Sequence, residues 1–99
     1  MKAIELKFND EMAKAALDGR KCCTSRRERK GWQGDEFEIG GVRFRILDVL
    51  RVRAREITRN YHHSEGFADV ESCAAALQTI YPDVSGEDYL AVHFFARCP

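Results

Sequence analysis

Two alternating runs joined by a pair of glycines constrain the fold of this chain more than any other feature. Apolar and charged residues alternate in Glu36–Ile39 and again in Val42–Arg45, on either side of Gly40-Gly41. A two-residue glycine linker between alternating runs is a strong signal for a β-hairpin. The expected cross-strand pairs are Ile39 with Val42, Glu38 with Arg43, Phe37 with Phe44 and Glu36 with Arg45. The sequence therefore predicts an antiparallel pair with one apolar face and one face of opposite charges.

A strand and a helix are predicted before the hairpin. Lys2–Phe8 alternates between apolar and charged residues, as in a half-buried strand. The helix is expected to begin at a cap formed by Asn9 or Asp10 and to stop at Gly19.

Further elements are predicted after the hairpin. Its second strand continues to Val52, and the polar segment Asn60–Gly66 is expected to be a loop. A second helix is predicted to start at the cap Asp69 and to end at Pro82, and the apolar run Tyr89–Arg97 suits a strand buried on both faces. Strands outnumber helices, so a small mixed barrel or curled sheet with two helices fits better than a parallel layer.

The size of the chain limits what it can hold. With 99 residues and 11.3 kDa, it is expected to form a single domain over residues 1–99, with one modest core and one site and no large cofactor. No apolar run approaches the roughly 18 residues of a membrane span, and the first residues lack the apolar core of a signal peptide. We therefore expect a cytoplasmic monomer that does not bind membranes.

The net charge of zero hides a segregation along the chain. Residues 20–59 carry a net charge of +6, whereas residues 60–99 carry −5. A zero total argues against a strongly basic coat for nucleic acid, but the segregation leaves such a role open. Arg51, Arg53 and Arg55 alternate along the chain with no obvious local acids to pair with, so they could form a phosphate-facing stripe or a solvated barrel exterior.

The four cysteines give no sign of a disulfide framework or a metal site. Without an export signal, the expected state is the reduced thiol. Cys22 and Cys23 are adjacent, a spacing that suits neither an ordinary disulfide nor a zinc ligand pair, and Cys73 is expected to fill the core. We therefore expect no metal.

The densest polar segment is the most basic part of the chain. Six cations occur in the eleven residues from Arg20 to Lys30, together with the hydroxyls of Thr24 and Ser25. Such a segment could cradle a phosphate or an anionic transition state, or it could be a solvated loop.

A second candidate region lies between Asn60 and Phe67. Adjacent His62 and His63 lack the spacing of a zinc-binding helix. Glu65 precedes a glycine, so its carboxylate either points into a cleft or is an ordinary surface acid. Elsewhere, Trp32 is expected to plug one end of the barrel, and stacking on a base is the alternative.

Five short blocks, in this order, resemble the ASCH domain of the PUA-like superfamily. Gly19–Arg26 resembles the family's G-R-K-T-x-T-x-R signature, with Cys22 in place of the first threonine, and Gly34–Phe37 resembles its G-D-x-F block. Glu65–Phe67, Ile80–Pro82 and Val92–Phe95 resemble its E-G-F segment, its I-Y-P helix end and its last strand. The resemblance implies an α+β fold, a small PUA-like β-barrel with two helices.

The resemblance implies two kinds of function. ASCH domains have been proposed as RNA-binding modules, and one branch of similar size consists of amidohydrolases that remove the acetyl group from N4-acetylcytidine. Such an enzyme hydrolyses a linear amide without a cofactor. The signature of that branch makes Lys21, Thr24 and Glu65 the catalytic residues, with a nucleoside or RNA as partner.

The implied chemistry requires an activated hydroxyl. Thr24 is a poor nucleophile without an adjacent base, and Lys21 could be that base only in its neutral form, which burial and neighbouring cations favour. Glu65 would then move a proton or orient the amide while Thr24 forms a transient acetyl-enzyme. Arg20 and Arg26 are the expected substrate-binding residues, with Arg26 at the pyrimidine carbonyl or the oxyanion.

Two alternatives remain open from the sequence. A non-catalytic RNA-binding module would join the arginine stripe and the segment Arg26–Lys30 in one continuous positive face. A ribonuclease would use Lys21 and Arg26 together with His62 and His63.

Overall fold

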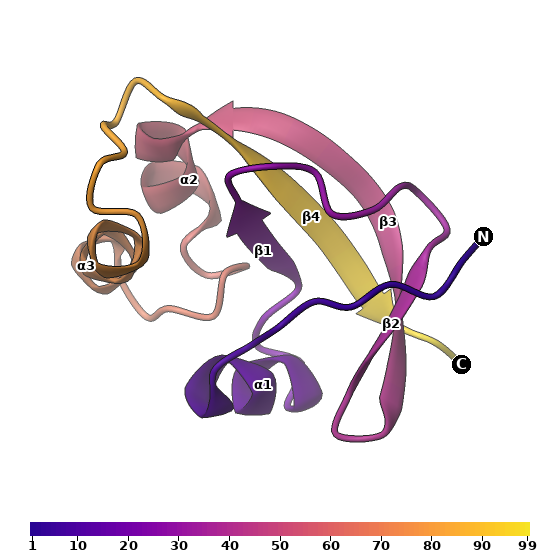
Figure 1. The fold of residues 1–99 in the computed structure, drawn as a ribbon. Helices are drawn as coiled ribbons and strands as arrows, with labels where there is room; N and C mark the ends of the chain where they lie inside the picture. Colours follow the sequence, from indigo (N-terminus) through magenta and orange to yellow (C-terminus); the bar gives the residue numbers. More distant parts are fainter.

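The computed structural model describes residues 1–99, which form three helices and a curled four-stranded sheet (Figure 1). In chain order the elements are α1 (Asp10–Leu17), β1 (Cys23–Arg26), β2 (Glu36–Ile39), β3 (Val42–Arg53), α2 (Ala54–Tyr61), α3 (Val70–Ile80) and β4 (Tyr89–Arg97). All pairs of neighbouring strands are antiparallel, in the order β1-β4-β3-β2. The predicted α+β class is confirmed, and the sheet is a half-barrel.

The hairpin of β2 and β3 has the predicted register, with Ile39 opposite Val42 and Glu36 opposite Arg45. Both turn glycines have positive φ, +55° at Gly40 and +80° at Gly41, which is a conformation that other residues adopt only with strain. The ion pairs differ from the prediction. Glu36 accepts hydrogen bonds from both Arg43 and Arg45, because its side chain lies between these two guanidinium groups on the outer face.

The strand β4 is buried on both faces, as its apolar sequence predicts. Alternate residues of a strand point to opposite sides, so β4 supplies apolar side chains to two separate cores. One core contains Ala91 and Phe95 together with residues of α1, β2 and β3, while the other contains Leu90 and Val92 together with residues of α2. The central strand therefore ties the two halves of the molecule together.

A bulge in β3 bends the sheet. Ile46 is opposite Phe95, but Asp48 is opposite Phe94, so Leu47 is the extra residue on β3. An extra residue on one strand increases the local bend and twist. Beyond it, β3 follows β4 as far as Arg53 opposite Tyr89.

The predicted strand over Lys2–Phe8 does not form. This segment makes a single parallel bridge, between Ala3 and Glu36, and then runs along the apolar core. Leu6 is buried, and Ile4 and Phe8 are partly buried against the same core. The alternation therefore reflects which side chains face the core rather than pairing in a sheet.

The three helices include one that the sequence analysis misses. The first, α1, is capped by the Asn9 side chain, which accepts a hydrogen bond from the amide of Met12 at 2.8 Å. The helix α3 has the predicted cap at Asp69. The missed helix is α2, which takes in Arg55 and the first two residues of the expected loop, Asn60 and Tyr61. None of the helices is long and apolar enough to cross a membrane.

The helix α2 forms because its apolar residues recur at helical spacing. Ala54 and Ile57 are buried and Tyr61 is half-buried, all packed in the second core. The alternating arginines that precede Ala54 suggest a longer strand, but Arg53 is the last residue in extended conformation. The chain then runs from α2 through Glu65 back towards α1 and β1.

Candidate active site

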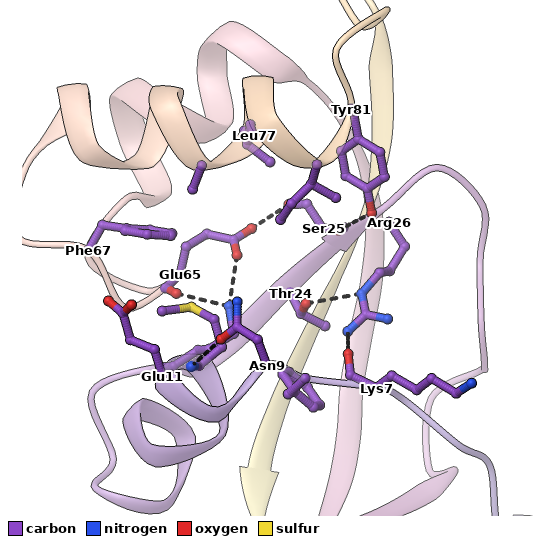
Figure 2. Close-up of a pocket in the computed structure, with 15 residues that line it drawn as sticks. Lys7, Asn9, Glu11, Thr24, Ser25, Arg26, Glu65, Phe67, Leu77 and Tyr81 are labelled. Atoms are coloured by element: carbon purple, nitrogen blue, oxygen red, sulfur yellow. Dashed lines mark hydrogen bonds and ion pairs between the residues drawn. The ribbon is translucent and has the colours of Figure 1, made fainter.

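A cavity of about 260 Å³ opens between α1, β1, α3 and the loop that follows α2 (Figure 2). Its lining combines apolar side chains with a few charged and hydroxyl groups: Lys7, Phe8, Asn9, Glu11, Met12, Lys21, Thr24, Ser25, Arg26, Glu65, Phe67, Ala76, Leu77, Ile80 and Tyr81. An apolar hollow with a few convergent polar groups is typical of a small-molecule site, and this volume lies slightly below the range for drug-sized ligands. The structure brings four of the predicted site residues to this cavity: Lys21, Thr24, Arg26 and Glu65.

A buried ion pair lies at one side of the cavity. The ammonium of Lys21 donates to the backbone carbonyl of Glu65 at 2.9 Å and to its carboxylate oxygen Oε1 at 3.0 Å. The two side chains are only 3% and 5% exposed. This geometry makes Lys21 a hydrogen-bond donor, in contrast to the neutral base considered from the sequence. Glu65 is the hydrogen-bond acceptor of the pair.

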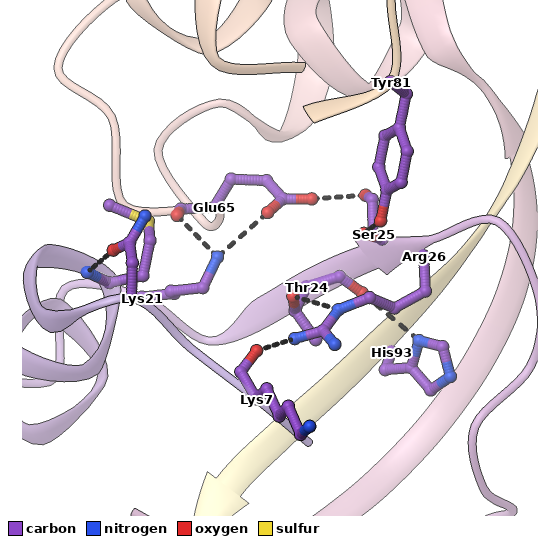
Figure 3. A network of polar contacts seen from close by, with 10 residues as sticks. Lys7, Lys21, Thr24, Ser25, Arg26, Glu65, Tyr81 and His93 are labelled. Carbon is purple, nitrogen blue, oxygen red and sulfur yellow. Dashed lines mark hydrogen bonds and ion pairs between the residues drawn. The ribbon is translucent and has the colours of Figure 1, made fainter. Parts of the chain in front are cut away.

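The second oxygen of the same carboxylate accepts a hydrogen bond from a serine. Ser25 Oγ donates to Glu65 Oε2, and the serine is itself buried, at 6% exposed (Figure 3). Lys21, Glu65 and Ser25 thus form one chain of hydrogen bonds within the cavity. Ser25 is one of the hydroxyls of the basic segment, and nothing in the sequence assigns it a role.

Thr24 lies next to Arg26 rather than next to the ion pair. Arg26 Nε donates to Thr24 Oγ1 at 3.2 Å, and another nitrogen of the guanidinium donates to the carbonyl of Lys7 at 2.7 Å. The guanidinium carbon lies 5.2 Å from the centre of the Phe8 ring. Burial lowers the pKa of Arg26, which nonetheless stays charged near neutral pH. Arg26 is therefore a fixed cation in the cavity wall.

His93 lies behind Thr24 and fixes the backbone of β1. Its Nε2 accepts a hydrogen bond from the amide of Lys30 at 2.9 Å, so the other nitrogen, Nδ1, carries the proton and donates to the carbonyl of Thr24 at 3.2 Å. The side chain is fully buried, and this burial lowers the pKa of His93. The neutral ring connects β4, β1 and the chain after β1.

Tyr81 holds the same strand from the opposite side. Its hydroxyl donates to the carbonyl of Ser25 at 3.1 Å. Burial raises the pKa of Tyr81, so the hydroxyl keeps its proton as a donor near neutral pH. The backbone carbonyls of Thr24 and Ser25 are thus each held by a side chain from another part of the fold.

The buried thiols near the ion pair are not reactive. Burial raises the pKa of Cys73 to about 12, and the nearby Glu65 carboxylate adds to this effect. The same two causes raise the pKa of Cys23 above its usual range. A thiol is nucleophilic as the thiolate, so neither cysteine is a nucleophile near neutral pH. All four cysteines are free, and no group of three or more His, Cys, Asp or Glu side chains could hold a metal ion.

Two residues of the basic signature lie outside the cavity. Arg20 is exposed and forms an ion pair with Asp18 at 3.1 Å. Cys22, which replaces the first threonine of the signature, is also exposed and faces a different hollow, against Leu17 and Phe95.

The two histidines after α2 do not reach the cavity. His62 Nδ1 is hydrogen-bonded to the carbonyl of Thr58 at 2.8 Å, and its ring lies 4.2 Å from that of His63. Neither ring lines the cavity that holds Lys21 and Arg26. The arrangement required for the ribonuclease alternative is therefore not formed.

Two of the three arginines of the predicted stripe are paired with an acid. Arg53 and Arg55 lie beside Glu87, with Arg53 Nε 3.9 Å from its carboxylate, and Arg51 lies over the ring of Tyr89. In the basic segment, Arg27 is paired with Asp83. The acids that pair with these arginines, Asp83 and Glu87, come from the last third of the chain. Their distance along the sequence explains why these ion pairs are not evident from neighbouring residues.

The prediction that Trp32 plugs one end of the barrel is wrong. The side chain is 63% exposed, and the guanidinium of Arg29 lies 4.0 Å from the ring centre. The adjacent Gly31 occupies the space close to the core instead, since an added Cβ there would meet Ile4 at 2.7 Å and Ile46 at 3.0 Å.

The fold and the cavity together define a class of small α+β proteins in which a curled antiparallel sheet and flanking helices enclose one polar site. The solved structures show which fold this is. The chain is similar to the crystal structure of an ASCH domain from Lactobacillus crispatus JV V101, with a TM-score of 0.72 and 14% identity over 97% of this chain and 79% of that chain. The chain therefore has the fold of an ASCH domain.

Two further structures share this fold. The hypothetical protein PH0355 aligns with a TM-score of 0.76 and 16% identity over 99% of this chain and 100% of that chain. Protein EF3133 from Enterococcus faecalis V583 aligns with a TM-score of 0.64 and 16% identity over 97% of this chain and 78% of that chain. No protein-family model matches the sequence, and the comparison with curated proteins finds no match.

Proposed function

We propose that this chain is an amidohydrolase that removes the acetyl group from N4-acetylated cytidine or a closely related nucleoside. The observation that supports the proposal is the buried Lys21–Glu65 pair, with 3.0 Å between Nζ and Oε1, at the wall of a cavity that also contains Thr24 and Arg26. Two charges are rarely taken out of water unless they are paired, and a buried pair among the convergent polar groups of a cavity is a candidate functional site.

The groups around the cavity suit the hydrolysis of an amide. Glu65 accepts the proton of the attacking hydroxyl and returns it to the departing amine. Lys21 and Arg26 supply positive charge where the carbonyl oxygen becomes negative. The resemblance to the amidohydrolase branch assigns the attack to Thr24. Arg20, which pairs with Asp18 outside the cavity, has no part in this proposal.

The RNA-binding alternative has less support. A protein that binds RNA through phosphates needs unpaired cations along the path of the strand. Here Arg27 is paired with Asp83, and Arg53 and Arg55 lie beside Glu87. Within the cavity, Arg26 has no acidic partner, and one such cation in a small hollow suits a ligand of nucleoside size better than a long strand.

The test is to incubate the purified full chain with N4-acetylcytidine and to follow acetate and cytidine together. We expect equal amounts of the two products, and a loss of activity of at least about 10²-fold in Lys21→Ala and in Glu65→Gln. Thr79→Val is the matched control, since Thr79 lies on the exposed side of α3 and bonds only to the carbonyl of Ala75. Activity that survives in both site variants would contradict the proposal.

A second measurement separates the alternative function. If the wild type releases no acetate, a filter-binding titration with a short single-stranded RNA at two salt concentrations decides between the two. Binding that falls steeply with salt would indicate an RNA-binding module.

A further inference from the structure

Two adjacent hydroxyls on β1 line the cavity, and they have different partners. Ser25 Oγ donates to a carboxylate oxygen of Glu65, whereas Thr24 Oγ1 accepts from the guanidinium of Arg26 (Figure 3). The side chains of these neighbours point in opposite directions in the site, one towards the loop that carries Glu65 and the other towards Arg26. The choice of nucleophile therefore depends on which hydroxyl has a base.

Ser25 has the base. An ionised carboxylate only accepts hydrogen bonds, so the bond to Glu65 places the hydroxyl proton of Ser25 on the line between the two oxygens. Attack by the serine oxygen and transfer of its proton to Glu65 then need no rearrangement. A nucleophile within hydrogen-bond distance of a base that a third group orients is the general pattern of such sites, and Lys21 is the third group here.

Thr24 lacks a base in this arrangement. Its oxygen receives a proton from Arg26, whose guanidinium has no acceptor and does not deprotonate near neutral pH. No hydrogen bond joins Thr24 Oγ1 to Lys21 or to Glu65 in the structure. A hydroxyl bonded to a permanent cation loses electron density and becomes a weaker nucleophile.

We infer that Ser25 is the hydroxyl that receives the acyl group and that Thr24 and Arg26 position the substrate. The inference rests on the proposed hydrolysis of an acylated amine and changes the residue that the resemblance assigns to the attack. It is carried by the Ser25–Glu65–Lys21 chain of hydrogen bonds, in which all three residues are buried and line the same cavity.

The two steps balance as follows. In the first step, Ser25 Oγ forms a bond to the acetyl carbon, its proton moves to Glu65, the C–N bond breaks, and Glu65 gives that proton to the departing amine nitrogen. In the second step, a water oxygen attacks the ester, Glu65 takes a proton from the water, the bond to Oγ breaks, and Oγ recovers the proton. The net reaction consumes one amide and one water, and releases acetate with its proton and the free amine.

The backbone around Ser25 is held for this role. The carbonyl of Ser25 accepts from the hydroxyl of Tyr81 at 3.1 Å, and Ser25 lies opposite Val92 in the ladder between β1 and β4. A nucleophile on a strand that is fixed in this way needs little reorganisation to reach the reacting geometry.

The test is to trap the acyl-enzyme and locate it. The full chain is incubated with p-nitrophenyl dimethylcarbamate, because a carbamoyl-enzyme is hydrolysed much more slowly than an acetyl-enzyme. Trypsin then releases the peptide Cys22–Arg26, which contains both hydroxyls. Fragmentation of this peptide in a mass spectrometer assigns the label to Ser25, to Thr24 or to a cysteine.

Two variants accompany the labelling. We expect Ser25→Ala to take up no label in this peptide and to lose at least about 10³-fold in kcat/KM with N4-acetylcytidine. We expect Thr24→Val to remain labelled on Ser25 and to lose less than about tenfold, mainly through KM. A serine that only holds Glu65 in place would also lower turnover when substituted, but the wild-type label would then be on Thr24.

The outcomes separate this inference from the proposed function. A label on Ser25 supports the inference, and a label on Thr24, or turnover of N4-acetylcytidine without any label, overturns it. A label on Ser25 without release of acetate from N4-acetylcytidine means that the nucleophile is correct and the proposed substrate is wrong. The absence of both label and turnover overturns both.

Discussion

Lys21 and Glu65 depend on each other for stability as well as for chemistry. Each side chain is almost fully buried, and each provides the charge that the other needs. A buried pair adds little to stability compared with an apolar pair of the same volume, but breaking it leaves one charge without compensation. The two residues therefore form a unit, in which losing both costs less than the sum of the two single losses.

A double-mutant cycle tests this coupling. We expect Lys21→Met and Glu65→Gln each to lower the free energy of unfolding by about 3 to 5 kcal/mol, because each leaves a buried charge unpaired. The destabilisation of the double variant should be smaller than the sum of the two single losses, and the difference should be on the order of 2 kcal/mol or more. Urea unfolding followed by circular dichroism measures the cycle. Additive losses would show that the two charges are solvated independently.

Cys22 offers a second test at the scale of one residue. Its side chain is exposed and faces away from the cavity of Lys21 and Glu65. We therefore expect Cys22→Thr, which restores the threonine of the ASCH signature, to change kcat/KM with N4-acetylcytidine by no more than about twofold. A tenfold change in either direction would mean that this position acts on the site from outside the cavity.

The site residues that can be identified from the sequence are those that belong to a short motif. The signature points to Lys21, Thr24 and Arg26, and a short block points to Glu65. The bond between Ser25 and Glu65 joins residues 40 positions apart, and no spacing in the sequence encodes which of two adjacent hydroxyls a distant carboxylate will meet. That choice depends on how the loop after α2 returns to β1.

The loop after α2 is the element that sets the position of Glu65. Gly66 follows Glu65 directly and has a φ of +97°. A Cβ at this position would lie 3.2 Å from Lys21 Cβ and 3.3 Å from Ala15 Cβ. The loop can therefore approach α1 and the segment before β1 this closely only with glycine.

Gly66→Ala tests the loop. We expect the free energy of unfolding to fall by about 1 to 3 kcal/mol, from the strain of a positive φ and the close contacts. We also expect turnover to fall more than stability alone explains, because displacement of the loop moves the carboxylate away from Lys21 and Ser25. Gly41→Ala is the control, since Gly41 also has a positive φ, +80°, but an added Cβ there meets nothing within 4 Å. Equal activity in the two variants would refute this role of the loop.

Elements are predictable from the sequence where local preference and burial agree. The hairpin, α1, α3 and β4 follow from glycines, caps and periodicity, and the register of the hairpin is correct at every pair. The segment Lys2–Phe8 fails because alternating burial against a core does not require a strand partner. The helix α2 fails because the alternating arginines before it mask the spacing of Ala54 and Ile57.

At the scale of the whole molecule, His93 is the group whose protonation first lowers the free energy of unfolding as the pH falls below neutral. Burial lowers the pKa of His93, so the folded state keeps the ring neutral where the unfolded chain, with a value near 6.5, takes up a proton. The stabilisation is therefore complete above about pH 6.5 and is lost as the pH falls towards the folded-state value. Hydrogen bonds from Arg43 and Arg45 lower the pKa of Glu36, and a hydrogen bond from the backbone amide of Trp32 lowers the pKa of Asp35. Protonation of these two carboxylates therefore reduces the stability only at lower pH.

This dependence can be measured on the wild type and on His93→Asn. We expect the wild type to lose up to about 1.4 kcal/mol of unfolding free energy per pH unit as the pH falls below about 6.5. The asparagine variant should be less stable near neutral pH, since it loses one of the two hydrogen bonds, but its stability should change little between about pH 7.5 and about pH 5. Urea midpoints across this range give both slopes. Parallel curves would rule out His93 as the titrating group.

The pairing of β1 with β4 also governs when the site can exist during folding. Thr24 and His93 are 69 positions apart, and β1 has no strand partner other than β4. Closing so long a loop costs chain entropy before the contacts of the two strands repay it. The hairpin and the helices can form from local contacts, whereas Thr24 and Ser25 reach their places only when β4 inserts between β1 and β3. We therefore expect the site to assemble late in folding, and a chain interrupted before Tyr89 would contain every proposed catalytic residue but have no strand to align them.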